Sequence, residues 1–110
     1  MTIYICNKEP KVKDAPAKWI DRRTVLGNPF NLTEYSRQES VQNYRRWLWR
    51  KIKTRDAAVC RKLKELKKLA MAGDLNLLCH CKPKVCHGDI IKAALEWAIR
   101  QEVKRKLMKK

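Results

Sequence analysis

Both histidines and three of the five cysteines of the chain lie between residues 79 and 87. They are Cys79, His80, Cys81, Cys86 and His87. Thiolate and imidazole groups bind zinc, and a thiol beside a histidine at the start of a helix is also a way to make a reactive nucleophile. The sequence therefore locates the chemistry of the protein in this segment, and three interpretations of the segment stay open.

The first interpretation is a zinc site. Cys79 and Cys81 are two residues apart on an expected strand, so both sulfurs point to one side of it. The stretch through Pro83 then returns Cys86 and His87 toward them, and four ligands of the type Cys3His would surround one tetrahedral ion. Structural zinc sites mostly use cysteines that are two to four residues apart in the chain, so this spacing favours zinc less strongly than such a knuckle does.

The second interpretation places the chemistry at the first turn of the last helix, where Cys86 and His87 are expected. Unpaired N–H groups and the helix dipole stabilise a thiolate or an incoming phosphate at such a place. In an enzyme the candidate catalytic residues are Cys86, His87 and Asp89, with Asp89 orienting the base. The candidate ligand-binding residues are Asn7, Asn28, His80, Lys82 and Gly88.

The third interpretation is structural. Cysteine is often a small buried hydrophobic residue, so Cys79 and Cys81 can belong to the core at the end of a central strand. His87 would then help to cap the last helix. This interpretation explains the two histidines, His80 and His87, and Cys86 least well.

The patterns on either side of the segment predict the elements that position it. A β-branched and aromatic run predicts a strand, the Ser36 to Glu39 capping box opens a helix, and apolar residues at helical spacing predict two more helices. The loop before the capping box is long enough to bind a ligand or to carry small strands of its own. The expected elements are a strand over residues 2–6, this loop over 8–35, a helix over 36–53, a helix from 54–56 to 72, a strand over 75–81 and a helix from about 86.

This order predicts one α/β domain over residues 1–110. Strands joined through helices are parallel, so we expect a small, mostly parallel sheet of two to four strands flanked by three helices, a Rossmann-like sandwich of two or three layers. In such sheets the binding crevice lies at the carboxyl ends of the strands, where Cys6, Asn7 and Cys79 to Cys81 would emerge. The basic residues of 100–110 are expected to form a helical tail that frays at its tip.

The chain carries 27 Lys and Arg residues against 11 Asp and Glu residues, a net charge of +16. Such an excess indicates an anionic partner, and Trp19 among Lys18, Arg22 and Arg23 offers an aromatic surface flanked by cations. We expect a nucleic acid or a nucleotide, with an acidic host protein as an alternative partner. No segment has the apolar length of a membrane span or the pattern of a signal peptide, so we expect a cytoplasmic protein without a membrane partner.

Several of these motifs together resemble one known family. They are Ile3-Tyr4-Ile5, Gly27-Asn28-Pro29-Phe30, Tyr44 with Trp47-Leu48, and Leu78 to Pro83 followed by Cys86-His87-Gly88-Asp89. The family consists of small uncharacterised domains of bacteria and their phages, and the resemblance covers residues 3–98. It implies no established activity, and a phage protein would act in the cytoplasm of the host. The chain departs from the family after the first strand, where Cys6-Asn7-Lys8 replaces the usual glycine-arginine turn.

Overall fold

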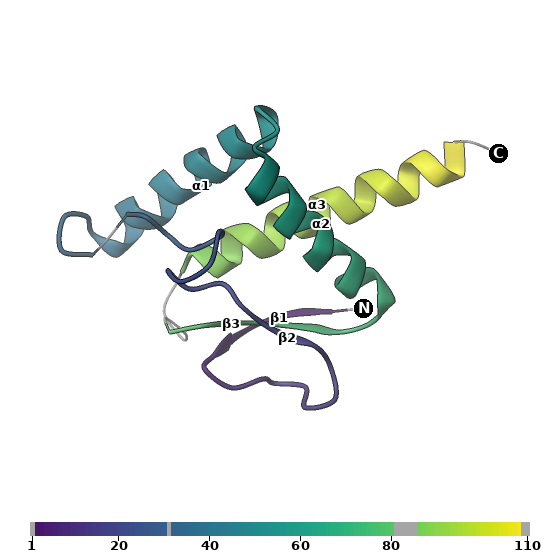
Figure 1. Cartoon of the computed structure of the whole chain (residues 1–110), viewed down its shortest axis with the longest axis horizontal. Coiled ribbons are helices and arrows are strands. Elements are labelled where there is room, and N and C mark those ends of the chain that lie inside the picture. The colour runs from purple at the N-terminus through teal and green to yellow at the C-terminus, as the bar shows by residue number, and fades with distance from the viewer. Residues whose placement is uncertain (1, 31, 81–85, 109–110) are drawn as a thin grey trace.

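The computed structural model describes residues 2–30, 32–80 and 86–108. This part of the chain contains three strands and three helices, in the order β1, β2, α1, α2, β3, α3 (Figure 1). Their bounds are β1 Ile3–Asn7, β2 Ala17–Trp19, α1 Arg37–Lys53, α2 Ala57–Ala72, β3 Leu75–Cys79 and α3 His87–Met108. The expected strand over 75–81 thus ends at Cys79 among the described residues, and Cys81 lies outside them.

The strands form one parallel sheet with β3 in the centre, in the order β1-β3-β2. Ile3 to Asn7 pair in register with Leu75 to Cys79, and Trp19 pairs with Leu78. The helices lie on one face of this sheet, and the loop over residues 8–16 lies on the other (Figure 1). The predicted small α/β fold with a parallel sheet and three helices is therefore confirmed.

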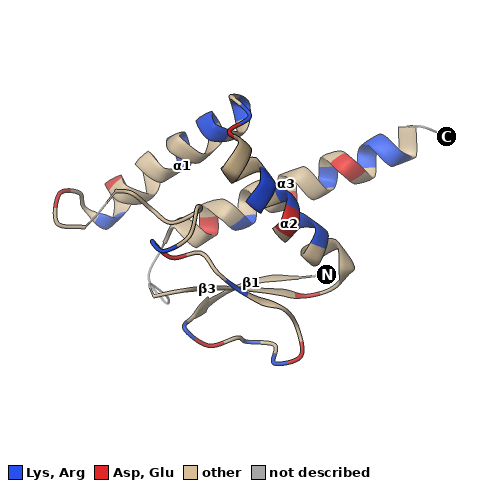
Figure 2. Ribbon diagram, viewed as in Figure 1, with Lys and Arg blue, Asp and Glu red and all other residues tan. Residues whose placement is uncertain are grey.

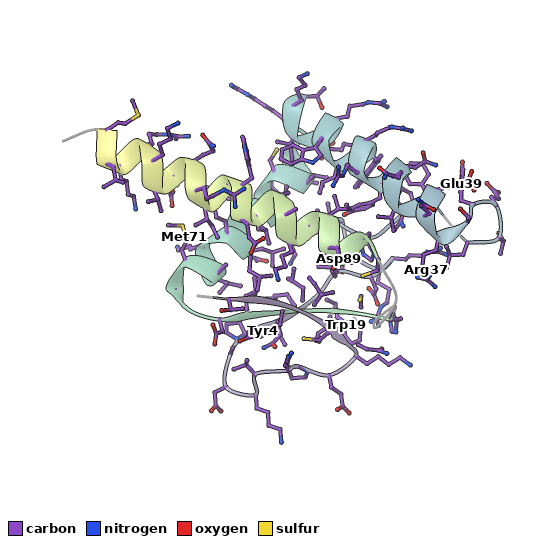
Figure 3. All side chains as sticks on the ribbon, turned by 180° about the vertical axis from the view of Figure 1, so that it is seen from behind. Tyr4, Trp19, Arg37, Glu39, Met71 and Asp89 are labelled. Atoms are coloured by element: carbon purple, nitrogen blue, oxygen red, sulfur yellow. The ribbon has the colours of Figure 1, made fainter. Side chains whose placement is uncertain are left out.

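The core lies between the sheet and the helices, where side chains fill the space (Figure 3). The apolar stripes expected on the helices provide it: Tyr44 and Leu48 of α1 and Leu66 of α2 are fully buried. Leu77 of β3 and Leu95 of α3 are buried in the same cluster. Because burial of such side chains drives folding, this layer fixes the helices over the sheet.

The middle and the end of the loop between β1 and β2 depend on Asn76, a polar residue of β3. Its side chain is fully buried, and its Oδ1 accepts hydrogen bonds from the backbone nitrogens of Lys11 and Val12 at 2.9 and 3.0 Å. Its Nδ2 donates to the carbonyl oxygen of Val12 at 2.9 Å and lies 3.3 Å from that of Pro16. A buried amide with these partners is fully used, and it holds the loop against the sheet.

The helix ends follow the predicted signals. Ser36 Oγ accepts from Glu39 N at 3.1 Å and Glu39 Oε1 accepts from Ser36 N at 3.0 Å, which is the capping box of α1. Asp56 caps α2 by accepting from Val59 N. α3 stays helical to Met108, and its last turns are mostly exposed.

The lysines and arginines spread over all three helices (Figure 2). None of the described helices combines the length and the apolar character that a membrane span needs.

Candidate functional site

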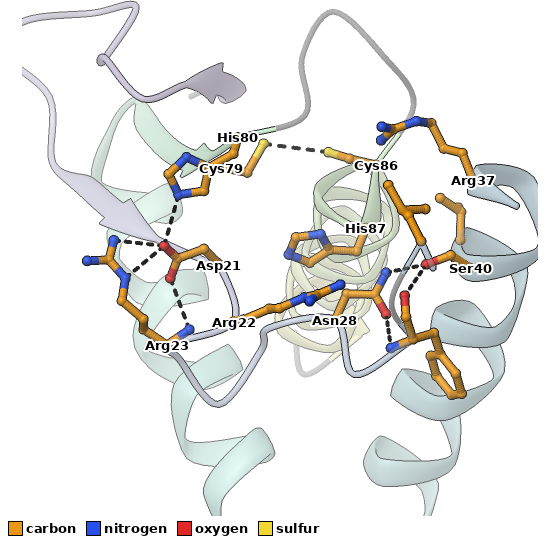
Figure 4. Close-up of a pocket in the computed structure, with 13 residues that line it drawn as sticks. Asp21, Arg22, Arg23, Asn28, Arg37, Ser40, Cys79, His80, Cys86 and His87 are labelled. Atoms are coloured by element: carbon orange, nitrogen blue, oxygen red, sulfur yellow. Dashed lines mark hydrogen bonds and ion pairs between the residues drawn. The ribbon is translucent and has the colours of Figure 1, made fainter. Parts of the chain in front are cut away.

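A cavity of about 360 Å³ lies at the carboxyl ends of the strands (Figure 4). Four segments that are far apart in the sequence surround it: the end of β3, the start of α3, the loop after β2 and the first turns of α1. Crossover connections bring these segments together because helices that follow parallel strands begin at the same edge of the sheet. The polar and sulfur-containing residues of its wall include Asp21, Arg22, Arg23, Asn28, Arg37, Ser40, Cys79, His80, Cys86 and His87.

Asp21 is the buried charge of this cavity. Its Oδ2 accepts from Arg23 Nε at 2.9 Å and from His80 Nε2 at 3.1 Å, and the Arg23 Nη2 lies 2.7 Å away. These hydrogen bonds, above all the one from the Arg23 side chain, hold the pKa of Asp21 below its usual value, although burial acts in the opposite direction. The side chain is only 8% exposed, so an ionised carboxylate stands inside the protein with its charge balanced by Arg23.

His80 is held in place by two neighbours and stays half exposed. Its ring stacks on Trp19 with centroids 5.2 Å apart, and the guanidinium of Arg23 covers Trp19 at 5.0 Å. Because the Asp21 carboxylate can only accept, His80 Nε2 carries the proton toward it and Nδ1 is the basic nitrogen of the neutral ring. The side chain is 49% exposed, so solvent and small molecules reach the imidazole.

His87 has the opposite environment. Its side chain is buried, Nε2 donates to the carbonyl oxygen of Ile20, and the ring meets Tyr44 edge to face at 5.1 Å. Burial lowers the pKa of His87, so the imidazole is neutral at neutral pH. Gly88 beside it has no room for a side chain, since a Cβ would lie 2.9 Å from the Ile5 side chain. These residues pack the start of α3 onto the sheet.

The thiols of Cys79 and Cys86 meet in the wall of the cavity. Their sulfurs are 3.6 Å apart, and the two residues are 1% and 2% exposed. Cys86 precedes the first residue of α3, and its backbone nitrogen donates to Asp89 Oδ2 at 3.2 Å. Asp89 therefore caps the helix, and its expected role in orienting a base stays a prediction.

Asn28 fastens the Gly27-Asn28-Pro29-Phe30 element to α1. Its Nδ2 donates to Ser40 Oγ at 2.8 Å, its Oδ1 accepts from Phe30 N at 2.9 Å, and the Ser40 hydroxyl donates to the Phe30 carbonyl oxygen at 2.6 Å. A Cβ at Gly27 would overlap the backbone of Asp21 and Arg22, so glycine is needed for this close approach. The element builds the wall of the cavity opposite Cys79.

The structure thus brings together most of the predicted site residues: Asn28, Cys79, His80, Cys86 and His87 line one cavity, and Gly88 and Asp89 stand directly behind them. Asn7 is exposed at the end of β1 and pairs with Cys79. Cys81 and Lys82 lie outside the described residues. Within 2–30, 32–80 and 86–108 no three Cys, His, Asp or Glu side chains are placed to hold a metal ion, and the zinc site, which includes Cys81, stays a prediction.

Sequence reasoning missed Asp21, Arg37 and Ser40 as parts of this site. Asp21 and His80 are 59 residues apart, and only the pairing of β2 with β3 makes them neighbours. The one signal available was the cluster of Trp19 with basic residues, which does lie at the cavity. Arg37 and Ser40 resemble ordinary residues of a first helical turn in the sequence.

The fold and the cavity define a small parallel α/β domain with a cavity at the carboxyl ends of its strands. The chain belongs to the family described as Domain of unknown function (DUF4326), whose family model matches residues 5–97. This confirms the expectation of an uncharacterised domain family, while a bacterial or phage origin stays a prediction. Comparisons with curated proteins and with solved structures give no match. The matched range ends within α3, so the basic last turns of this helix lie beyond it.

Proposed function

We propose that the protein binds a nucleotide, either free or as the exposed unit of a nucleic-acid strand, in the cavity at the carboxyl ends of the strands. One observation carries the proposal: apolar side chains and arginines line the same cavity. Phe30, Leu32 and Val41 offer a surface on which the flat face of a base can lie. The volume of about 360 Å³ lies within the range of roughly 300–1,000 Å³ that small-molecule sites have.

The arginines would provide the specificity for an anionic group of the ligand. Arg23 is paired with Asp21, while Arg22 and Arg37 line the cavity from the loop and from the first turn of α1. A guanidinium presents two parallel donors to phosphate oxygens, which suits it to a nucleotide more than to a neutral ligand. The first turn of α3 adds the positive end of a helix dipole beside the same cavity.

The net charge of +16 supports the polymeric form of this ligand. Exposed lysines and arginines of the three helices would contact phosphates on either side of the bound unit (Figure 2). Such contacts add affinity that falls with salt, whereas binding of one base in the cavity depends on salt much less. The two contributions can therefore be measured separately.

The test is a titration of the protein with mononucleotides and with short single-stranded oligonucleotides at low and moderate salt, in which tryptophan fluorescence reports binding. Arg37→Gln should weaken binding by about 10- to 150-fold, since a hydrogen bond to a charged group is worth about 1.5–3 kcal/mol. Arg50→Gln is the matched control, because this arginine is exposed on the same helix and does not line the cavity. Equal losses in both variants, or no binding of any mononucleotide by the wild type, would reject the cavity as the site.

An enzyme acting on a nucleotide is the second candidate, and the Asp21–His80 pair favours it. A carboxylate that orients a half-exposed imidazole is the arrangement of a general base. His80 suits this role better than His87, which is buried and donates to a backbone carbonyl. Chromatography of nucleotides after incubation with the protein tests it: His80→Gln should abolish turnover and keep binding. Absence of turnover over a panel of phosphoesters and N-glycosides would rule this candidate out.

A further inference from the structure

Two thiols face each other in the cavity wall, and the fold holds both of them. Cys79 is the last residue of the central strand, in register with Asn7, and its carbonyl oxygen accepts from Lys8 N at 2.9 Å. Cys86 is fixed through Asp89, whose carboxylate accepts from its nitrogen and whose nitrogen donates to its carbonyl oxygen at 3.1 Å. The fold has therefore already paired the two side chains, and little further chain ordering is needed to join them.

We infer that Cys79 and Cys86 form a redox-active pair, which closes to an intramolecular disulfide in exchange with a low-molecular-weight disulfide of the glutathione type. The sulfurs are 3.6 Å apart and a disulfide is about 2.05 Å long, so they must approach by about 1.5 Å. Both residues line the cavity of about 360 Å³, and because they are only 1% and 2% exposed, one sulfur must turn toward the cavity before a small disulfide can react with it.

The exchange takes place in two steps. One cysteine, as its thiolate, attacks a sulfur of the reagent RSSR; a protein–reagent mixed disulfide forms, the S–S bond of the reagent breaks, and one RS⁻ leaves. The second cysteine, as its thiolate, attacks the protein sulfur of the mixed disulfide, and the second RS⁻ leaves. Two electrons pass from the protein sulfurs to those of the reagent, and the two thiol protons end on two molecules of RSH. An excess of RSH reverses both steps.

The other described cysteines lack this arrangement. The Cys6 thiol donates to Asn76 Oδ1 at 3.6 Å on the opposite side of the sheet from the helices, and Cys60 lies on α2. They serve as internal references for thiols that stay reduced under the same conditions. Cys81 is close in sequence and must be distinguished by experiment.

Oxidation of the pair also acts on the cavity. The two sulfurs belong to its wall, so the disulfide removes two thiol donors and moves the wall beneath the ligand. This consequence rests on the proposed function: the affinity for a mononucleotide should change at least about threefold between the dithiol and disulfide forms, a shift well above the error of a titration.

The experiment follows the pair by mass spectrometry. Wild-type protein and a Cys81→Ser variant are treated with a chelator, equilibrated with mixtures of reduced and oxidised glutathione, quenched in acid and alkylated. Trypsin cleaves after Lys84, so Cys79 and Cys86 end on different peptides that only a disulfide joins. In both proteins the disulfide-linked peptides should become the main species as the glutathione mixture is made more oxidising. Fragmentation of the linked peptides should place the disulfide at Cys79. Cys6 and Cys60 should stay reduced and therefore be found in the alkylated form.

A further variant shows whether the second thiol resolves the first. In Cys81→Ser/Cys86→Ser, glutathione should remain on Cys79 as a stable mixed disulfide, and a Cys60→Ser control should behave as the wild type. The inference is overturned if Cys79 and Cys86 are found alkylated under oxidising conditions or if each carries glutathione. It is also overturned if the disulfide of the wild type joins Cys81 to Cys86. It is also overturned if the protein isolated without chelator holds one zinc per chain and resists oxidation. These peptide readouts do not depend on ligand binding, so the inference and the proposed function fail independently.

Discussion

Replacing Asn76 by aspartate should make the stability of the fold fall steeply as the pH rises. The change keeps the size of the side chain and the oxygen that accepts from Lys11 N and Val12 N. It replaces the amide nitrogen by a second oxygen, which then faces the carbonyl oxygens of Val12 and Pro16 at the distances of 2.9 and 3.3 Å that the donor had. The residue is fully buried, so water cannot relieve the conflict.

The magnitude follows from the charge that this substitution buries. An uncompensated buried charge costs about 3–5 kcal/mol, so the free energy of unfolding of Asn76→Asp at pH 7.5 should lie below that of the wild type by this amount. Burial raises the native-state pKa of the introduced carboxyl above the unfolded value of about 3.9. The native state then binds the proton at higher pH than the unfolded state, and stability is lost as the pH rises from about 3.9 through the raised pKa, with a slope of up to about 1.4 kcal/mol per pH unit.

Urea denaturation followed by far-UV circular dichroism at pH 7.5 and pH 5.0 measures both effects. The deficit of Asn76→Asp relative to the wild type should shrink by about 1–3 kcal/mol at the lower pH. Gln42→Glu, which adds the same charge at an exposed position of α1, should show neither the deficit nor the change. A deficit below about 1 kcal/mol at pH 7.5, or one that does not narrow on acidification, would refute the role assigned to this amide.

Three further predictions concern the packing around the cavity. Burial lowers the native-state pKa of His87, so the free energy of unfolding of the wild type should fall by up to about 1.4 kcal/mol per pH unit as the pH drops below the unfolded-state pKa of about 6.5. Urea titrations at several pH values should show a weaker pH dependence of this free energy for His87→Gln. Gly88→Ala should cost about 1–3 kcal/mol in thermal unfolding, because its Cβ meets two isoleucine side chains at 2.9 and 3.0 Å, whereas Gly73→Ala, with nothing within 4 Å, should be close to neutral. Tyr44→Phe leaves the Leu26 carbonyl without the hydroxyl that donates to it at 2.6 Å, so the free energy of unfolding measured in urea should fall by about 1–3 kcal/mol. An unchanged midpoint of the urea transition would contradict this.

Local signals in the sequence were sufficient for the helices and for the general position of the site. The capping box at Ser36, the apolar stripes around Tyr44 and Leu66, and the apolar run of β3 each depend on neighbours within a few residues. The meeting of Cys79 with Cys86 followed from one general rule, that parallel strands and the helices after them converge at one edge of the sheet. These features are local or topological, so one sequence was enough to predict them.

The remaining features depend on contacts between distant segments. β2 has only three residues, Ala17–Trp19, and forms because the open edge of β3 offers hydrogen bonds to it. All five residues of β3 are buried although their side chains alternate between the two faces of the sheet, because the loop over 8–16 covers the face that carries Asn76. The partner of His80 could not be named without β2, since Asp21 follows this strand.

Both described chain ends point away from the cavity. All three strands run toward it, so β1 starts at the opposite edge of the sheet, and α3 begins beside the cavity and carries the chain out to Met108 (Figure 1). A label, a surface attachment or a fused protein at either terminus therefore leaves the opening facing the solution. The protein can be immobilised by its tail on a biosensor chip and screened against small-molecule libraries without blocking the mouth of the cavity.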